Sequence, residues 1–296
     1  METSSDDEGD SATLLNKYAL IIFVLLPLFL HKPKQPPTIF SVATLPKSAP
    51  VVSTATRAEK PKPVKKKKLY ITFDDGPNKG TKNVMHIVQD EAVPVSFFVV
   101  GEHVFASPTQ GRLWDSLKMM QEIDICNHSY SHAHGRYENY YQKPDSVVSD
   151  FRRTHDSLRL HNTIARTPGR NIWRVDTLQF TDLKKSRAAA DSLQKAGFVL
   201  MGWDLEWHFD HKTMSVSTPA ESVVAQIDSV FKHKRTKKDG HLVLLAHDQV
   251  YHKAEDSFQL RRFFQLLKEK EDIEFSLVKT YPGTDALPDS VKVKPY

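Results

Sequence analysis

The sequence predicts an α/β fold, namely a distorted or incomplete (β/α) barrel of about seven parallel strands, preceded by an N-terminal hydrophobic segment and a linker. Three observations predict it. Short apolar runs alternate with segments of helical periodicity from Leu69 onward. Reactive side chains follow the ends of these apolar runs, and in a (β/α) barrel the carboxyl ends of the strands meet on one face. The chain of 296 residues is also long enough for one large domain.

Seven apolar runs are expected to form the strands, with helices between them. The strands are expected at 69–73, 95–100, 123–126, 163–166, 198–203, 242–246 and 273–278. The helices are expected at 79–91, 113–122, 144–161, 181–195, 219–232 and 258–270, with Thr181 as the cap of one and Gly197 as its stop. Strands separated by helices indicate a parallel sheet whose outer face the helices cover.

Three segments precede the expected folded domain at 69–296. Residues 1–17 are polar and acidic, residues 18–30 are an unbroken apolar run, and residues 31–68 form a linker rich in Pro and Lys. The 13 residues of the apolar run span about 20 Å as a helix, which is short of a hydrocarbon core of about 30 Å. This favours a signal-peptide core or a short membrane anchor, hence a protein of the cell envelope or an exported one. The flanking charges leave its topology and its cleavage open, because acidic residues precede the run and Lys32 and Lys34 follow it.

Composition excludes several classes of protein. The net charge of +5 comes in good part from the lysine-rich stretch that ends at 65–68, so no nucleic-acid partner is indicated. We interpret that stretch as a solvated spacer, with docking to an anionic polymer or phospholipid as the alternative. The single cysteine, Cys126, excludes an intrachain disulfide and zinc sites built from several thiolates. The sequence leaves the oligomeric state open.

Five reactive clusters each follow the end of an expected strand. They are Asp74-Asp75, 128–132, 166–169, 204–207 and His247-Asp248. Adjacent residues of a strand point to opposite faces, so Asp74 and Asp75 need not have the same role. In a barrel, all five clusters would converge on the face where the active site forms.

His128 and His132 are four residues apart, so on a helical turn they share a face and can hold one metal ion. A chance surface pair is the usual explanation of this spacing alone. Here a carboxylate after the first strand can supply a third ligand, which indicates Zn²⁺ or a similar divalent ion. Either Asp75 or Asp74 can be that ligand, and the other can act as a base.

These motifs, read in order, resemble those of a known family. Thr72-Phe-Asp-Asp-Gly-Pro77, His128-Ser-Tyr-Ser-His132, Arg166-Thr-Pro168 and Leu245-Ala-His247 are similar to the motifs of the polysaccharide deacetylases, the NodB-homology domain of carbohydrate esterase family four. The likeness covers roughly residues 69–280. It implies a distorted (β/α) barrel that removes N-acetyl or O-acetyl groups from polysaccharides with one divalent metal.

The resemblance also implies a role for each matching residue. Asp74 matches the catalytic base, and Asp75, His128 and His132 match the metal ligands. Arg166 matches the arginine that holds the base, and His247 matches the general acid. Leu245 and Trp207 match the walls of the acetyl pocket, a backbone N–H near Gly169, after Pro168, matches an oxyanion donor, and Glu206 aligns with the aspartate that tunes the acid.

Three positions depart from the family pattern. Cys126 stands where a glycine usually precedes Asn-His. Gly169 replaces an aromatic residue, so a wall contributed by that side chain is absent. The fourth motif, 203–210, has an unusual ending, which leaves Asp204 and Asp210 as alternatives to Glu206.

The implied function is hydrolysis of acetyl groups, N-acetyl groups of GlcNAc-type sugars first, on a cell-envelope or extracellular polysaccharide. Zn²⁺ is the first choice of metal, with Co²⁺, Ni²⁺ and Mn²⁺ as alternatives. A catalytically silent carbohydrate-binding relative and a metal-free amidohydrolase are the competing hypotheses, and the complete set of base, ligands, arginine and acid argues against both. Tyr137, Tyr140 and Tyr141 can stack on sugars or serve as ordinary loop aromatics.

Overall fold

The computed structural model describes residues 66–285. The acidic segment 1–17, the apolar run 18–30 and the linker up to residue 65 lie outside the described residues. None of the helices between residues 66 and 285 has the length and apolar character needed to cross a lipid bilayer.

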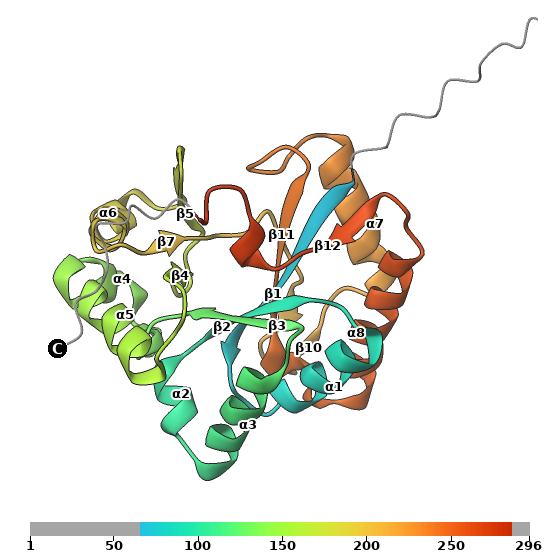
Figure 1. Ribbon diagram of the computed structural model, residues 1–296, viewed down its shortest axis with the longest axis horizontal. Coiled ribbons are helices and arrows are strands. Elements are labelled where there is room, and N and C mark those ends of the chain that lie inside the picture. Colours follow the sequence, from blue (N-terminus) through green and yellow to red (C-terminus); the bar gives the residue numbers. More distant parts are fainter. Residues whose placement is uncertain (1–65, 286–296) are drawn as a thin grey trace, which may run out of the picture. The chain divides into compact units, whose positions relative to one another are not determined.

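A curled, mostly parallel sheet forms the centre of the domain (Figure 1). Its strands are β1 (Lys67–Gly76), β2 (Val95–Val99), β3 (Ile123–Asn127), β4 (Ile164–Ala165), β5 (Ile172–Val175), β6 (Leu178–Thr181), β7 (Val199–Leu200), β8 (Leu205–Glu206), β11 (His241–His247) and β12 (Ile273–Phe275). The order is β6-β5-β7-β4-β3-β2-β1-β11-β8, and β12 pairs with the start of β1. The path has two ends, β6 and β8, so the prediction of an incomplete (β/α) barrel is confirmed.

Helices cover the outside of this sheet (Figure 1). They are α1 (Thr81–Glu91), α2 (Gly101–Phe105), α3 (Pro108–Met119), α4 (Tyr137–Tyr141), α5 (Pro144–Leu158), α6 (Arg187–Lys195), α7 (Ala220–Lys232) and α8 (Ala254–Lys268). Short 3₁₀ turns lie at His132–Gly135, Lys184–Ser186, Asp248–His252 and Val278–Thr280, and a small antiparallel hairpin joins β9 (Phe209–Asp210) to β10 (Ser215–Val216).

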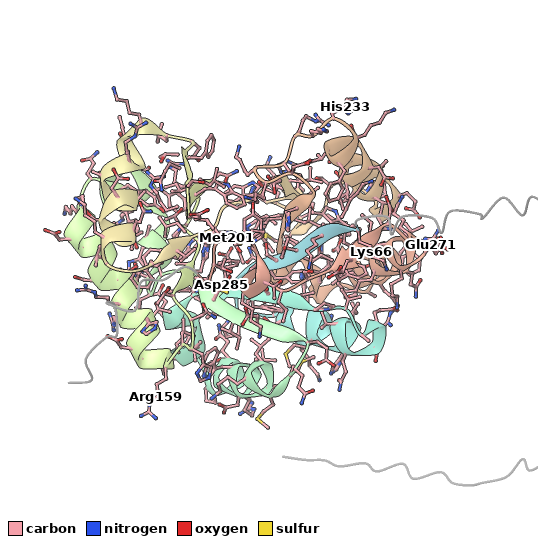
Figure 2. The ribbon with its side chains drawn as sticks, turned by 45° about the horizontal axis from the view of Figure 1, so that its top comes forward. Lys66, Arg159, Met201, His233, Glu271 and Asp285 are labelled. Carbon is pink, nitrogen blue, oxygen red and sulfur yellow. The ribbon has the colours of Figure 1, made fainter. Side chains whose placement is uncertain are left out.

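The alternation of β1 places its last side chains at the site. Leu69, Ile71 and Phe73 belong to the core shared with α1, α7 and α8. Tyr70 points the other way, into the core of the barrel interior, where Phe98, Cys126, Trp173 and Met201 pack. In Figure 2 Met201 lies in the middle of the domain, whereas Arg159, His233 and Glu271 lie at its periphery. Thr72 and Asp74 continue the inward series, so the strand delivers a carboxylate to the interior end of the barrel.

Two expectations about element boundaries were wrong. The first strand begins at Lys67 rather than Leu69, because β12 pairs with Lys67–Leu69 and Asp272 and Glu274 form ion pairs with the two lysines. Thr181 does not cap a helix but ends β6, and α6 begins at Arg187. The antiparallel hairpin β5–β6 occupies the place where loop and helix were expected.

Candidate active site

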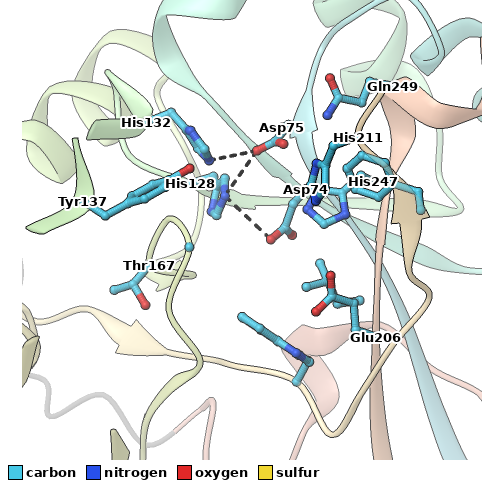
Figure 3. Close-up of a pocket in the computed structure, with 14 residues that line it drawn as sticks. Asp74, Asp75, His128, His132, Tyr137, Thr167, Glu206, His211, His247 and Gln249 are labelled. Carbon is cyan, nitrogen blue, oxygen red and sulfur yellow. Dashed lines mark ion pairs between the residues drawn. The ribbon is translucent and has the colours of Figure 1, made fainter. Parts of the chain in front are cut away.

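A cavity of about 450 Å³ opens at the carboxyl ends of the strands (Figure 3). It brings together five segments that are distant in the sequence, as expected for a barrel. Its lining residues are Asp74, Asp75, His128, His132, Tyr137, Thr167, Gly169, Trp203, Glu206, Phe209, His211, Leu245, His247 and Gln249.

Asp74 and Asp75 both face this cavity, although they are adjacent in a strand. The pairing of β1 with β2 shifts register between Asp74 and Gly76, and Asp75 has a left-handed backbone with φ of 73°. The carbonyl of Asp75 accepts a hydrogen bond from Nδ1 of His103, 2.7 Å away. This irregularity turns the second carboxylate to the same side as the first.

Asp75, His128 and His132 have potential ligand atoms that all lie within 4.8 Å of one another. Oδ1 of Asp75 is 3.5 Å from Nε2 of His128 and 3.1 Å from Nε2 of His132. The spacing suggested that the two histidines share a face of a helix, but the structure has no helix there that presents both. Ser129 and His132 have left-handed backbones, with φ of 66° and 48°, and this tight turn returns the second imidazole toward the first.

The donor set fits a divalent cation. Nδ1 of His128 lies 2.9 Å from the carbonyl of Arg166 and donates to it, so the neutral imidazole would present the lone pair of Nε2 to Asp75. Two electron-rich atoms face each other there, and Oδ1 of Asp75 is buried without a hydrogen bond to any of residues 66–285. Two imidazoles and a carboxylate are ligands that Zn²⁺ accepts, with positions left for water or substrate.

The electrostatics of the trio Asp75, His128 and His132 also favour a positive charge at this position. Burial opposes ionisation of Asp75, but the imidazoles of His128 and His132 outweigh burial and hold the pKa of this carboxyl well below its usual range. Burial likewise disfavours the charged form of His128, but Asp74 and Asp75 raise the pKa of its imidazole above the ordinary value. A bound cation would supply the same charge in place of protons.

Arg166 binds one carboxylate oxygen of Asp74. Its guanidinium donates to Oδ1 of Asp74 at 2.8 Å and to Oγ1 of Thr72 at 2.7 Å, and it is completely buried. The bond to Asp74 is a buried ion pair, in which the positive charge offsets the negative one. Oδ2 of Asp74 remains free to face the cavity, 3.6 Å from Nε2 of His128.

His247 faces the trio from the end of β11 (Figure 3). Its ring packs against the ring of Phe209, with centroids 5.0 Å apart. Its Nδ1 is buried and makes no hydrogen bond within the described part of the chain. The ring of Phe209, rather than a carboxylate, therefore orients the imidazole of His247.

Comparison with known proteins agrees with this geometry. Residues 61–190 match the family model described as polysaccharide deacetylase. Residues 61–190 are therefore similar in sequence to the polysaccharide deacetylases. The chain is 23% identical over 226 residues to the chitin disaccharide deacetylase of Vibrio alginolyticus, a match that covers 54% of this chain and 53% of that protein. The chain thus spans about half the length of this curated relative.

Solved structures show the same fold. The carbohydrate esterase family four enzyme of Streptococcus mutans superposes with a TM-score of 0.53 at 21% identity, covering 72% of this chain and 87% of that one. The catalytic domain of the peptidoglycan N-acetylglucosamine deacetylase of Eubacterium rectale superposes with a TM-score of 0.51 at 18% identity, covering 76% and 94%. The curled barrel of this domain is therefore the fold of these two solved structures.

The three candidate partners of His247, which are Asp204, Glu206 and Asp210, have other contacts. Glu206 lines the cavity, but its ion-pair partner is His208 at 3.6 Å. Asp204 accepts from the backbone N–H groups of Lys237 and Val243, at 2.7 and 2.9 Å. Asp210 accepts from two backbone N–H groups of its own turn. Glu206 is left as the one of the three that faces the cavity.

Of the four residues expected to bind substrate, Leu245, Gly169, Trp207 and Pro168, two do not line the cavity. Leu245 and Gly169 line the cavity, as expected. Trp207 instead packs in the core against Phe263, with ring centroids 4.9 Å apart, and Trp203 lines the cavity in its place. Pro168 is absent from the lining, and its carbonyl accepts a hydrogen bond from the hydroxyl of Tyr141 at 2.7 Å.

Sequence reasoning missed several residues that line this cavity. They are Thr167, Trp203, Phe209, His211 and Gln249. Position gives a signal for some of them, because Thr167 and Gln249 lie within two residues of predicted site residues and Trp203 follows a strand. Phe209 and His211 sit on a hairpin whose strands have two residues each, too short to show any periodicity.

Proposed function

We propose that this protein is a metal-dependent hydrolase that removes acetyl groups, N-acetyl groups of GlcNAc-type sugars first, from a cell-envelope or extracellular polysaccharide. The observation that carries the proposal is one cavity in which the Asp75, His128 and His132 trio stands between an arginine-held carboxylate, Asp74, and an imidazole, His247. The names of the Vibrio and Eubacterium proteins, which act on chitin disaccharide and on peptidoglycan N-acetylglucosamine, support this class of substrate.

The trio would hold the metal, with Zn²⁺ first and Co²⁺, Ni²⁺ or Mn²⁺ as alternatives. When bound, the cation supplies Lewis-acid polarisation of the acetyl carbonyl and makes a water molecule more acidic.

The chain's own residues move the protons. Asp74 accepts a proton from the attacking water through its cavity-facing oxygen, while Arg166 keeps the other oxygen in place. The water oxygen bonds to the acetyl carbon, and the carbon–nitrogen or carbon–oxygen bond to the sugar breaks. His247 donates a proton to the departing sugar nitrogen or oxygen. Leu245 and Trp203 confine the acetyl group in the cavity.

We propose that the enzyme works outside the cytoplasm, either exported or anchored to the membrane by 18–30. The apolar run in the sequence supports this, since no polar face interrupts it. Fractionation of cells that express the full chain, with and without residues 18–30, tests it. Equal release of both forms into the medium would contradict anchoring.

Acetate release from acetylated chito-oligosaccharides and peptidoglycan tests the main proposal. Wild-type protein should release acetate, and a chelator should abolish release until Zn²⁺ is added back. Asp74→Asn and His247→Ala should each lower kcat about 100-fold or more. Release that survives complete chelation would contradict the metal mechanism, and binding of a glycan without any release would favour a carbohydrate-binding protein.

A further inference from the structure

Helix α4 carries three tyrosines, and one of them is used differently from the other two. The hydroxyl of Tyr140 donates to Oδ2 of Asp150 at 2.8 Å, and that of Tyr141 donates to the carbonyl of Pro168 at 2.7 Å. The hydroxyl of Tyr137 makes no hydrogen bond with any residue between 66 and 285. Its ring lines the cavity, and in Figure 3 its hydroxyl points toward His128 and His132.

Two neighbours fix the position of the Tyr137 ring. The ring meets His132 edge to face, with centroids 5.8 Å apart and planes at 83°. Gly169 is the second neighbour, since a Cβ atom there would lie 3.1 Å from Cε1 and Cζ of Tyr137. Gly169 also has a left-handed backbone, with φ of 62°. The space that a side chain at position 169 would need is therefore filled by Tyr137.

Tyr137 and His247 stand on opposite walls of the cavity, with Asp74 and the trio between them (Figure 3). A carbonyl carbon placed for attack by a water molecule next to Asp74 would turn its leaving atom toward His247. Its oxygen would then lie on the side of the trio and of Tyr137. A neutral phenol that faces this position is a hydrogen-bond donor that has no acceptor among residues 66–285.

We propose that the Tyr137 hydroxyl donates a hydrogen bond to the acetyl oxygen as it becomes negatively charged, and that Gly169 makes the space for this ring. The inference rests on the proposed deacetylation and adds a catalytic residue to it. The phenol keeps its proton throughout, because the proton of water goes to Asp74 and the leaving atom receives its proton from His247. A prepositioned donor of this kind acts mainly in the transition state.

Tyr137→Phe is the first test. It keeps the ring and removes the donor, so kcat for acetate release should fall about 100-fold while KM changes less than about threefold. Tyr140→Phe is the matched control in the same helix, because its hydroxyl bonds Asp150 outside the cavity, and its kcat should stay within about threefold of wild type. A Tyr137→Phe enzyme that releases acetate at the wild-type rate would overturn the proposal.

A binding measurement separates this role from a structural one. The probe is a chito-oligosaccharide in which a methylphosphonamidate replaces one acetamido group, since its tetrahedral anion imitates the attacked carbonyl. Tyr137→Phe should weaken binding of this probe about as much as it lowers kcat/KM. When it is added to the Asp74→Asn variant, it should leave the affinity of that protein for the acetylated oligosaccharide unchanged. Equal affinity of wild type and Tyr137→Phe for the probe would overturn the role of Tyr137, whether or not acetate is released.

Gly169→Ala tests the second half of the inference. In the wild-type background the added methyl should displace the Tyr137 ring and lower kcat at least tenfold. In a Tyr137→Ala background it should cause less than a threefold further loss, because no ring is left to displace. Equal losses in both backgrounds would contradict the link between the two positions. A wild-type protein that releases no acetate from any polymer would instead count against the proposed function.

Discussion

Arg166 is the buried residue on which the position of Asp74, the proposed base, depends. Its side chain is fully buried, donates to the carbonyls of Met201 and Gly202 as well as to Asp74, and lies over the ring of Phe98 at 4.1 Å. A buried charge is tolerated when each of its donors has a partner. Arg166 therefore links three strand ends and fixes one oxygen of Asp74.

Arg166→Met should lower the free energy of unfolding by about 3–5 kcal/mol, because it leaves Asp74 buried and unpaired. Adding Asp74→Asn should recover part of that loss, since the uncompensated charge is then gone. Urea unfolding of the two single variants and the double variant measures the coupling. Strictly additive losses would contradict the view that the ion pair dominates at Arg166.

Residue identity predicted most of the chemistry of the site but not all of its walls. Asp74, Asp75, His128, His132 and His247 could be predicted because each follows an apolar strand and has a distinctive chemistry. The sequence did not allow us to predict which of Trp203 and Trp207 lines the cavity. The two-residue strand β8 pairs with β11, and this places Trp207 on the helix side while Trp203 stays at the cavity. A strand of two residues leaves no alternation to read.

At the scale of elements, the hairpin β9–β10 forms one wall of the cavity. Its Phe209 packs between two imidazoles, with centroids 5.0 Å from His247 and 4.4 Å from His211. Lys253 anchors the hairpin by donating to Oγ of Ser215 at 2.8 Å. The hairpin therefore sets the orientation of His247.

Phe209→Ala should lower kcat about tenfold, because the imidazole of His247 loses the ring that orients it. The free energy of unfolding should change little, since the ring is only partly buried. Acetate release and urea unfolding measure the two effects. Phe105→Ala, at an exposed phenylalanine outside the cavity, is the control and should keep the wild-type rate.

Two glycines make a matched test of helix packing. A Cβ on Gly111, inside α3, would have the carbonyl oxygen of Val104 as its nearest neighbour at 3.8 Å, so Gly111→Ala should stabilise the protein by about 0.5–1 kcal/mol. A Cβ on Gly80, at the start of α1, would lie 1.9 Å from the carbonyl oxygen of Asp248. Gly80→Ala should therefore destabilise by about 1–3 kcal/mol in urea unfolding, and a stabilised Gly80→Ala protein would contradict the close contact.

The long periodic elements were predictable, whereas the hairpin β5–β6 was not. Helices α1, α5, α7 and α8 overlap the expected ranges because each presents an apolar face to the sheet. In β5–β6 the side chain of Arg174 donates to the carbonyl of Phe180 and to Oγ1 of Thr181 at 2.9 and 3.0 Å. This tertiary contact holds Thr181 in a strand, although its sequence position favours a helix cap.

At the scale of the whole domain, Asp248 joins the ends of β1 and β11. It is fully buried and accepts hydrogen bonds from the side chains of Asn78 and Thr81. Burial raises the pKa of this carboxyl to about 7, against the opposing effect of those hydrogen bonds. The folded state therefore favours the protonated form, and the contribution of Asp248 to stability is full below about pH 4 and declines as the pH rises toward 7.

Asp248→Asn should remove this decline, because an amide of the same shape does not ionise. Between pH 5 and 7 the free energy of unfolding of the variant, relative to that of wild type, should increase by up to about 1.4 kcal/mol per pH unit. Urea unfolding in chelator at several pH values measures it. Asp204, whose pKa burial raises to about 6, contributes equally to both proteins. A difference between variant and wild type that stays constant with pH would contradict the assignment.

The left-handed backbone of Asp75 limits how this site can vary. Asp and Asn adopt such a φ far more readily than Glu does. An exchange of Asp75 for glutamate, although it keeps a carboxylate, would straighten the bulge and rotate Asp74 away from its arginine. Asp75, the proposed metal ligand, and Asp74, the proposed base, are thus one conformational unit, and Asn at position 75 is the neutral replacement that leaves the Asp74 carboxylate where it stands.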